Sequence, residues 1–435
     1  MEPAVLVLGG GIAGIQAALD VAEQGVHVYL VERSPSIGGH MAQLDKTFPT
    51  LDCSLCILTP KMVDVARHPN VELLTYSEVV GAERAGKIFK VRILKKPRYV
   101  DEDKCTGCGA CMEKCPMKKI PDEFNLGLSY RTAIYIPFPQ AVPKVAVIDP
   151  EHCLYLTRGK CRLCEKVCQA GAIDFSQKPE EIEVQVGAII VATGFRQADV
   201  SALSEYGYGR YDNVITALEL ERLLNAAGPT GGRVVRPSDH KEPKRVAFIQ
   251  CVGSRDRRLG RPYCSRVCCM YAVKNAVLIK EHYPETEVTI YYIDMRAYGK
   301  GFEEFVQRAR EEFGVRLVKG RIARLEEDAN TGDLWLMAED IDSGRVLRER
   351  YNLVVLSAGL VPSEGAEDLA ELLGLSTDDY GFFSGPSLKL NPVLAQGGIF
   401  VCGCAAGPKD IPDSVAEASA AAMEAVNYLR EVGLL

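Results

Sequence analysis

Apolar and polar positions follow the same order in two distant parts of the chain. Residues 3–33, PAVLVLGGGIAGIQAALDVAEQGVHVYLVER, predict a buried strand, a loop, a helix and a second strand. In residues 245–294 the stretches RVAFIQ, CCMYAVKNAVLIKEHY and VTIYYID repeat that order. Residues 186–195, VGAIIVATGF, predict a further buried strand, and residues 397–426 predict a strand, a glycine turn and a long Ala-rich helix. The pattern therefore predicts an α/β protein with two βαβ units.

The loop of the first unit carries the motif Gly9-x-Gly11-x-x-Gly14, and Glu32 ends the second strand. Gly9 permits the tight turn, Gly11 lets the backbone approach a pyrophosphate, and Gly14 lets the helix pack close to the strand. The helix N-terminus directs free N–H groups at the phosphates, and Glu32 accepts hydrogen bonds from a ribose. These residues predict a dinucleotide site rather than an ordinary glycine-rich turn.

Length and charge narrow the class of protein. The chain has 435 residues, of which 47% are apolar, so two or three packed units are expected. Its net charge of −7 is spread along the sequence, which argues against nucleic acid as a partner. The N-terminus shows no targeting pattern and no run of 18 apolar residues exists, so we expect a cytoplasmic protein without a membrane span.

Sixteen cysteines are many for a long chain without a secretion signal, and they indicate metal or redox chemistry rather than a disulfide scaffold. The stretch DEDKCTGCGACMEKCP has the spacing of a bacterial ferredoxin, and a second, less regular set follows it. In such pairs the fourth cysteine of each run binds the other cluster. One predicted [4Fe–4S] cluster is held by Cys105, Cys108, Cys111 and Cys168, and the other by Cys115, Cys153, Cys161 and Cys164. Zinc remains the alternative, although it fits two interleaved runs poorly.

The second βαβ unit lacks a glycine motif after its first strand, so its backbone offers no close approach to a pyrophosphate. Cys251, Cys264, Cys268 and Cys269 stand there instead. If helical, Cys264 and Cys268 lie on one face. We expect these four thiols to hold a third [4Fe–4S] cluster; buried free cysteines are the alternative.

Residues 186–195 and 397–426 resemble elements of the two-dinucleotide-domain flavoproteins, the thioredoxin and glutathione reductase class. The resemblance implies FAD and a matching fold. The ferredoxin-type cysteine runs lie between these flavin segments, so we expect a two-cluster α+β ferredoxin domain as an insertion. Here Cys404 replaces the Asp that usually follows Gly403, which affects the expected ribityl contact. The predicted FAD contacts are Gly9, Gly11, Ile12, Ala13, Gly14, Glu32, Arg33, Gly39, Ala192, Thr193, Gly194, Gly403, Cys404 and Ile411.

The predicted domains follow from these motifs. They are a first FAD-binding part (1–97), the inserted ferredoxin domain (98–178), a continuation of the FAD-binding domain (179–242), a degenerate NAD(P)H-like domain with the third cluster (243–355) and a final FAD-binding part (356–435).

The chain as a whole resembles the A-type subunits of heterodisulfide reductase. The resemblance is carried by GGHMAQLDKTFPTLDCSLCILTPKMVDVARHPNV, YVDEDKCTGCGAC, IYIPFPQAVPK, CVGSRD, YCSRVCCMYAVKNA, GKGFEEFVQRAREEFGV and GPKDIPDSVAEASAAA. It implies an FAD and [4Fe–4S] electron-transfer subunit, in some members bifurcating. The implied partners are B- and C-type subunits and a donor such as a hydrogenase, formate dehydrogenase or ferredoxin, with a homodimer inside a larger assembly. Compared with the long members, this sequence lacks their N-terminal domain and C-terminal ferredoxin.

Lys274 lies five residues after Cys269, on the same predicted helix. In the resemblance this helix approaches the flavin ring, where a cation stabilises reduced, anionic flavin. A solvated lysine is the alternative. Glu219 and Glu221 are weaker candidates for the same position.

Cys53-x-x-Cys56 follows Gly38-Gly39 and precedes Pro60-Lys61, as in glutathione-reductase-like enzymes. Three interpretations stay open: a disulfide facing the flavin, ligands that share a cluster with a partner's thiols, or a packed and reduced pair.

The leading hypothesis is an electron-transfer subunit. The alternatives are the A-type component of a quinone-interacting membrane-associated complex, an NAD(P)H-dependent flavoprotein, a disulfide reductase acting at Cys53 and Cys56, and an assembly factor with structural clusters. The NAD(P)H-dependent flavoprotein would need a second glycine loop.

Overall fold

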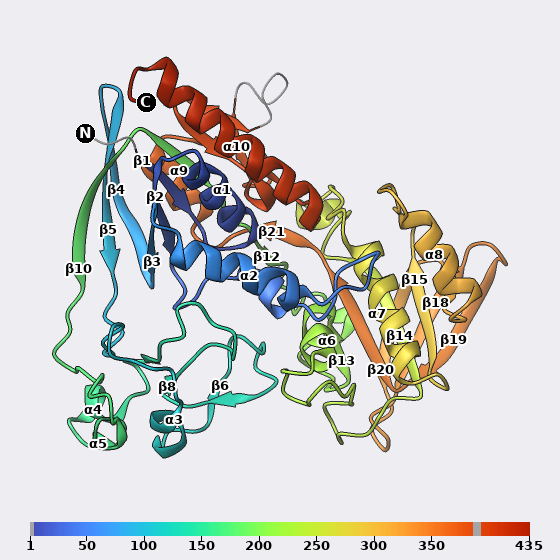
Figure 1. The fold of residues 1–435 in the computed structure, drawn as a ribbon. Helices are drawn as coiled ribbons and strands as arrows, with labels where there is room; N and C mark the ends of the chain where they lie inside the picture. Colours follow the sequence, from blue (N-terminus) through green and yellow to red (C-terminus); the bar gives the residue numbers. More distant parts are fainter. Residues whose placement is uncertain (1–3, 386–392) are drawn as a thin grey trace.

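The computed structural model describes residues 4–385 and 393–435 and folds them into two α/β units, with a further lobe attached to the first (Figure 1). Residues 1–3 and 386–392, which belong to the predicted ranges 1–97 and 356–435, lie outside the described part of the chain.

The first unit is built on a six-stranded sheet with the order β24-β25-β11-β1-β2-β3. Its central strand β1 is buried along its whole length and pairs in parallel with β2 and β11. A strand covered on both faces explains the unbroken apolar run AVLVL. The strands are β1 (Ala4–Leu8), β2 (His27–Glu32), β3 (Val71–Thr75), β11 (Ala188–Val191), β24 (Leu394–Gln396) and β25 (Ile399–Val401).

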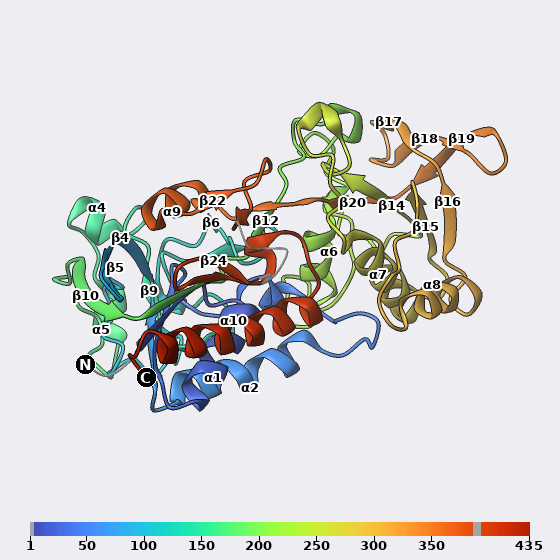
Figure 2. The ribbon, with the colours of Figure 1, turned by 90° about the horizontal axis from the view of Figure 1, so that it is seen from above.

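Two layers cover this sheet. Helices α1 (Ile12–Glu23), α2 (Ser54–Arg67) and α10 (Ile411–Glu431) pack on one face. The antiparallel strands β4 (Ser77–Ala85), β5 (Ile88–Lys95) and β10 (Glu180–Val186) cover the other face together with α9 (Ala366–Leu373). Figure 2 shows α1, α2 and α10 on one side of the unit and α9 on the other. The remaining short elements of this unit are η1 (Gly39–Gln43), β22 (Ser376–Thr377), β23 (Phe383–Ser384) and η4 (Gly403–Ala406).

The second unit is a five-stranded parallel sheet with the order β13-β20-β14-β15-β16, covered by three helices on one face and a three-stranded antiparallel sheet on the other. The elements are β13 (Val214–Thr216), α6 (Ala217–Leu224), β14 (Arg245–Val252), α7 (Cys268–His282), β15 (Glu287–Tyr292), α8 (Phe302–Glu311), β16 (Arg316–Lys319), β17 (Ile322–Glu327), β18 (Leu334–Asp340), β19 (Arg345–Tyr351) and β20 (Leu353–Ala358), with η2 (Ser204–Tyr206) and η3 (Arg257–Leu259) in loops. β13 pairs with β20, so residues 214–224 join this unit, whereas the predicted range 179–242 assigned them to the first. The two predicted βαβ units are both present.

The two units are connected by β12 (Phe195–Gln197) and β21 (Leu360–Pro362), which form an antiparallel pair. Apart from this pair, contacts between the units come from loops and helices.

The lobe comprises the chain between β5 and β10. These strands pair with each other from Phe89 to Lys95, so the chain leaves and returns at the same edge, as an insertion does. The lobe has its own small core and lies below the first unit in Figure 1. Its elements are α3 (Ala110–Lys114), β6 (Ile120–Pro121), β7 (Tyr130–Arg131), β8 (Ile134–Tyr135), β9 (Val147–Ile148), α4 (Leu154–Arg158) and α5 (Leu163–Val167).

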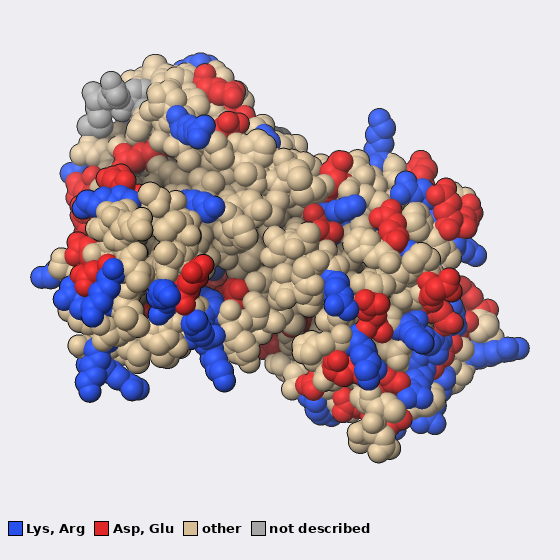
Figure 3. All heavy atoms as spheres, turned by 60° about the horizontal axis from the view of Figure 1, so that its bottom comes forward, with Lys and Arg blue, Asp and Glu red and all other residues tan. Residues whose placement is uncertain are grey.

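Acidic and basic side chains are interspersed over the face shown in Figure 3, and no single-sign field covers it. Within the described residues, no helix combines the length and apolarity that crossing a bilayer requires.

Candidate functional site

A cavity of about 1300 Å³ begins at the first βα corner and extends to the second unit. Its walls include most of the residues predicted to hold FAD: Gly9, Gly11, Ile12, Ala13, Glu32, Arg33, Gly39, Ala192, Thr193, Gly194, Cys404 and Ile411. Gly14 and Gly403 are not in the walls. The cavity therefore brings together residues from the start, middle and end of the chain.

The glycine corner is shaped by the backbone. Gly9 has φ 102°, and a Cβ there would lie 2.5 Å from the carbonyl oxygen of Ala192. A Cβ on Gly14 would lie 1.8 Å from the carbonyl oxygen of Gly9, so only glycine allows α1 to pack this closely. At Gly11 no atom lies within 4 Å of the position of a Cβ, and no side chain caps α1. The corner thus offers free N–H groups beside open space, which fits a pyrophosphate.

Glu32 is held in place at the end of β2. One of its carboxylate oxygens accepts a hydrogen bond from Gly10 N at 2.7 Å, and the other accepts one from Ser34 N at 2.7 Å. The carboxylate is therefore fixed at the cavity wall, where the sequence predicted a ribose partner.

The end of β11 contributes a polar atom without a partner. The hydroxyl oxygen of Thr193 is buried and makes no hydrogen bond within the described chain. A buried hydroxyl is normally paired, so this atom fits a ligand group in the cavity.

The residues of the C-terminal segment differ in their contacts and in whether they line the cavity. Gly403 has φ 63°, and its N–H donates to Glu417 Oε2 at 3.1 Å. Lys409 is nearly buried, lies 3.3 Å from Glu417 and lines the cavity. Burial raises the pKa of Glu417. The sequence alone indicated no role for Lys409 or Glu417, although both lie in the stretch GPKDIPDSVAEASAAA that carries the resemblance.

Lys274 lies in the cavity wall contributed by the second unit. It is 1% exposed, forms an ion pair with Glu221 and donates to the carbonyl oxygen of Lys46 at 3.0 Å. The interpretation as a solvated lysine is therefore wrong. Glu221 also lines the cavity, whereas Glu219 closes a capping box with Thr216 at the start of α6 and accepts from Tyr208.

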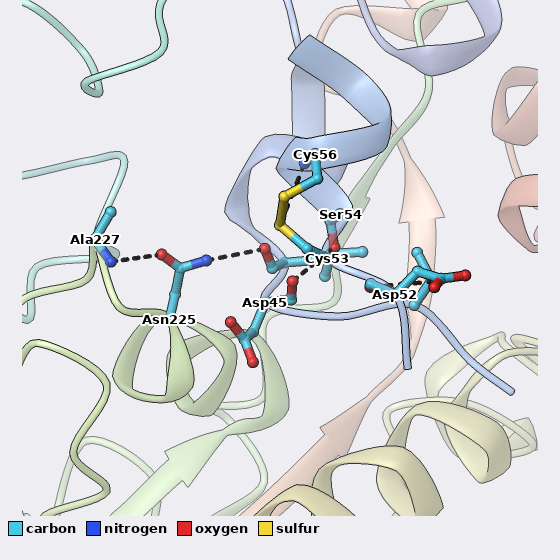
Figure 4. The surroundings of a disulfide bond; sticks show 9 residues. Asp45, Asp52, Cys53, Ser54, Cys56, Asn225 and Ala227 are labelled. Carbon is cyan, nitrogen blue, oxygen red and sulfur yellow. Dashed lines mark hydrogen bonds between the residues drawn. A yellow bond between two sulfur atoms is a disulfide. The ribbon is translucent and has the colours of Figure 1, made fainter. Parts of the chain in front are cut away.

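Cys53 and Cys56 form a disulfide at the start of α2, with their Cα atoms 5.2 Å apart (Figure 4). Both residues are exposed, which differs from the packed, reduced interpretation. Their neighbours Asp52 and Ile57 line the cavity, but the two cysteines do not. The disulfide thus lies at the cavity rim.

The thiols of the lobe gather in two overlapping groups. Cys115, Cys153, Cys161 and Cys164 line one small pocket, as predicted for the second ligand set. Burial raises the pKa of Cys164 to about 12, with further contributions from the nearby Cys153, Cys111 and Cys115 thiols.

Cys105, Cys108 and Cys111 form the other group. Burial and the neighbouring Cys105 raise the pKa of Cys111 to about 11. Cys168 follows α5 and accepts a hydrogen bond from Ala172 N at 3.3 Å. Helix α3, which carries Cys111, packs against α5, which Cys168 follows directly.

The second βα corner brings together the four thiols that were predicted to hold the third cluster. Cys251 lies on β14 with φ 60°, and Cys268 and Cys269 are the first residues of α7. Cys264 precedes the helix, so the predicted shared helical face with Cys268 does not form. Burial, followed by the charges of Cys251 and Cys264, raises the pKa of Cys269 to about 11.

Among residues 4–385 and 393–435, no three Cys, His, Asp or Glu side chains stand close enough to hold one metal ion. A four-iron cluster binds each thiolate through a different iron atom, so its ligands stand farther apart than those of zinc. The gathered thiols are compatible with cluster binding.

A family model described as "Pyridine nucleotide-disulphide oxidoreductase" matches residues 3–425. Two solved thioredoxin reductases share the fold: that of Lactococcus lactis, at TM-score 0.53 and 16% identity, and that of T. acidophilum, at TM-score 0.53 and 13% identity. Each match covers 99% of this chain and 100% of the other. The predicted two-dinucleotide-domain fold is confirmed.

Curated relatives match over nearly the whole chain. The chain is 55% identical to the A-type subunit of the "H(2):CoB-CoM heterodisulfide,ferredoxin reductase" of Methanothermobacter marburgensis, over 98% of this chain and 64% of that protein. It is 57% identical to the A-type iron-sulfur subunit of the "CoB--CoM heterodisulfide reductase" of Methanocaldococcus jannaschii, over 97% of this chain and 64% of that protein. The chain thus spans about 64% of the length of these relatives. The resemblance to the A-type subunits of heterodisulfide reductase is confirmed, and the chain belongs to the pyridine nucleotide-disulphide oxidoreductase family.

Proposed function

We propose that this chain is an electron-transfer subunit of a heterodisulfide-reductase-like complex that binds FAD and three [4Fe–4S] clusters. The observation that carries the proposal is one cavity with the glycine corner at one end and the helix α7, which begins with two cysteines, at the other. The names of the relatives, one a ferredoxin reductase component and the other an iron-sulfur subunit, support the same function.

FAD would be held by residues of all three chain segments that line the cavity. The N-terminus of α1 and the open side of Gly11 receive the pyrophosphate, Glu32 receives the ribose, and Thr193 supplies a free hydroxyl. When bound, the flavin and clusters supply one- and two-electron chemistry. The protein binds and orients them and sets their reduction potentials.

The clusters would occupy the three thiol groups. Residues 98–178 would act as a ferredoxin-like domain with the two predicted ligand sets, and Cys251, Cys264, Cys268 and Cys269 would bind the third cluster. The buried thiols have raised pKa values, so the charge of iron has to stabilise their thiolate form.

Lys274 would place a positive charge at the flavin end of the cavity. Its ion pair with Glu221 and its bond to the Lys46 carbonyl orient the ammonium group at the wall. A cation there favours reduced, anionic flavin.

The partners would be B- and C-type subunits and a low-potential or hydrogen-linked donor. Relatives are named for H(2), formate and ferredoxin, which supports a hydrogenase, formate dehydrogenase or ferredoxin as donor. Electron bifurcation, a quinone-linked acceptor and a homodimer within the assembly are finer forms of the same proposal. Purifying the native complex anaerobically and identifying its subunits tests the partners; a chain purified alone would contradict them.

The cofactor content gives the decisive test. Anaerobically purified protein should contain about one FAD and about twelve iron atoms per chain, four for each cluster. Flavin with far fewer iron atoms would overturn the proposal. Clusters that dithionite cannot reduce would favour a structural role instead.

A second candidate function is reduction of a disulfide substrate at Cys53 and Cys56, which the exposed disulfide at the cavity rim supports. A Cys53→Ser/Cys56→Ser variant should then lose activity while keeping its flavin and iron. Full electron transfer between the partners in that variant would dismiss the candidate.

A further inference from the structure

Residues 44–53 leave the first unit and lie against the second, and we call this segment the strap. The strap has internal hydrogen bonds: Thr47 N donates to the Asp52 carbonyl at 2.8 Å, and Leu51 N donates to the Thr47 carbonyl at 3.0 Å. Lys46 and Cys53 form an antiparallel bridge at its base. It is therefore an ordered loop between η1 and α2.

Buried polar groups of the second unit bind the strap backbone. Asp45 N donates to Glu221 Oε2 at 3.0 Å, and Lys274 donates to the Lys46 carbonyl. Asn225, at the end of α6, donates to the Leu44 carbonyl at 3.3 Å. Figure 4 shows Asn225 beside Asp45, close to the disulfide that begins α2.

Apolar side chains of the strap enter the core of the second unit. Phe48 and Leu51 pack against that core, and the rings of Phe48 and Phe302 lie 5.4 Å apart, edge to face. The strap therefore contributes both polar and apolar contacts across the boundary between the units.

Arg222 of α6 joins three segments at this boundary. It is 2% exposed, and its guanidinium donates to the Gln43 carbonyl at 2.9 Å and to Asn125 Oδ1 at 3.0 Å. The guanidinium also lies 4.9 Å from the centre of the Phe124 ring. Gln43 in turn donates to the Phe124 carbonyl at 3.0 Å.

The same network reaches the connection between the units. His40 bonds to Gln43 at 2.7 Å and to the carbonyl of Phe195 in β12 at 2.9 Å. Thus η1, the lobe, α6 and β12 are linked by successive hydrogen bonds.

Two units connected by a short pair of strands are expected to move relative to each other unless a substantial interface prevents it. Buried hydrogen bonds to a charged group resist such motion, because opening the interface leaves the partners unpaired. Here the second unit makes four side chain–backbone hydrogen bonds with residues 43–46, and three of them involve a charged side chain.

We propose that the strap locks the second unit onto the first, and that Arg222, which binds the carbonyl of Gln43 directly before the strap, is the positioning residue for the strap and, through it, for Lys274 at the cavity wall. The link to the flavin rests on the proposed function, whereas the lock itself does not.

Amide hydrogen exchange of the anaerobically purified full chain tests the proposal. In Arg222→Met, the strap amides of Thr47 and Leu51 should exchange about 10-fold faster or more, because local opening no longer breaks the Arg222 bonds. Peptides of β12 and β21 should also exchange faster, and small-angle scattering should show a more extended molecule. Arg222→Lys, which keeps the charge but not the fork of donors, should fall between.

Arg236→Met is the matched control. Arg236 is also buried, and it donates to Asp333 at 3.0 Å and to the Thr331 carbonyl at 2.7 Å, both in the second unit. The Arg236→Met variant should have a lower melting temperature but unchanged amide hydrogen exchange in the strap.

Unchanged strap exchange in Arg222→Met, or an equal increase in Arg236→Met, would overturn the proposal. Iron and flavin are measured in the same samples. A wild type that lacks iron but has a protected strap would overturn the proposed function and leave the lock standing.

Discussion

The two βα corners have the same topology but differ in what fills them, which is bare backbone and open space in the first and side chains in the second. In the first, Gly11 faces open space beside an uncapped helix end, and a Cβ at Gly9 or Gly14 would strike the backbone. In the second, side chains fill the space. A Cβ on Gly253 would lie 3.3 Å from Ala198 Cβ, and one on Gly359 would lie 3.0 Å from Ser265 Oγ.

Under the proposed function, one supersecondary unit supports two chemistries. A phosphate needs bare backbone and a helix N-terminus, whereas an iron–sulfur cluster needs thiols from several directions. The second corner obtains those thiols from a strand, a loop and a helix start at Cys251, Cys264 and Cys268. Once these side chains are present, the corner has lost the form that nicotinamide nucleotides require. Rapid bleaching of the flavin by NADH alone would contradict this conclusion.

The strongest test of the first corner is Gly14→Ala. Its Cβ would lie 1.8 Å from the Gly9 carbonyl oxygen, so α1 must move away from β1. We expect the free energy of unfolding to fall by about 3 kcal/mol or more, with loss of flavin. Thermal unfolding and FAD quantification of the purified protein measure both effects.

Gly11→Ala is the matched variant, because its Cβ meets no protein atom within 4 Å. It should keep the melting temperature and weaken FAD binding, since the methyl group projects toward the expected pyrophosphate. Equal destabilisation by both variants would show that the corner is only a tight turn.

At the second corner, Cys268→Ala should remove one cluster. We expect a loss of about four iron atoms per chain with FAD retained, because the glycine corner is separate. Cys402→Ala, at a buried thiol of the first unit, should leave the iron content unchanged. Iron analysis and the visible spectrum distinguish the variants. An undiminished iron content in Cys268→Ala would mean that the cysteines of this corner are ordinary core residues.

Lys274 faces the cavity between the two corners, and its effect should be smaller. Removing only the lysine would leave the Glu221 charge buried, which typically costs about 3–5 kcal/mol, so Lys274→Met is combined with Glu221→Gln. Because the double variant removes both charges, its flavin midpoint potential is compared with that of Glu221→Gln alone, and it should be about 30 mV lower, or about 1.4 kcal/mol for two electrons. Lys61→Met, whose lysine bonds Gln16 outside the cavity, should not change it. If the flavin midpoint potential stays constant in both comparisons, Lys274 does not belong to the flavin site.

Asp45 should give the smallest effect. Burial and the nearby Glu221 charge raise the pKa of this strap carboxyl. Its charged form is therefore less stable in the folded state, and that penalty is complete above the folded pKa and absent below the unfolded one. Asp45→Asn should stabilise the protein by about 0.5 kcal/mol at pH 8, after solvent screening, and by less near pH 4. Melting temperatures across this range check the trend; a gain that grows toward acid would have the wrong sign.

Local motifs predicted the first corner well. Gly9, Gly11 and Gly14 act within one turn of the chain, so their spacing alone indicated the strand, loop and helix. The ferredoxin-type spacing likewise indicated that Cys115 would lie near Cys153, Cys161 and Cys164, and these four residues line one pocket.

Contacts between distant segments could not be predicted. Residues 214–224 joined the second sheet because β13 pairs in parallel with β20, more than a hundred residues later, and a three-residue strand carries little pattern. Lys274 was expected near the flavin only from the resemblance, and its burial against Glu221 left no signal in the sequence. Arg222 had no motif at all, since its role depends on Gln43 and Asn125 from two other parts of the fold.

The first sheet is completed only when β25, at Ile399–Val401, has been synthesised and paired with β11. The lobe with residues 105–168 leaves the ribosome much earlier and has a core of its own. Under the proposed function, iron insertion could therefore begin during translation, whereas the flavin would have to wait for a nearly finished polypeptide. The strand order of a single sheet would then set the order in which the cofactors are acquired.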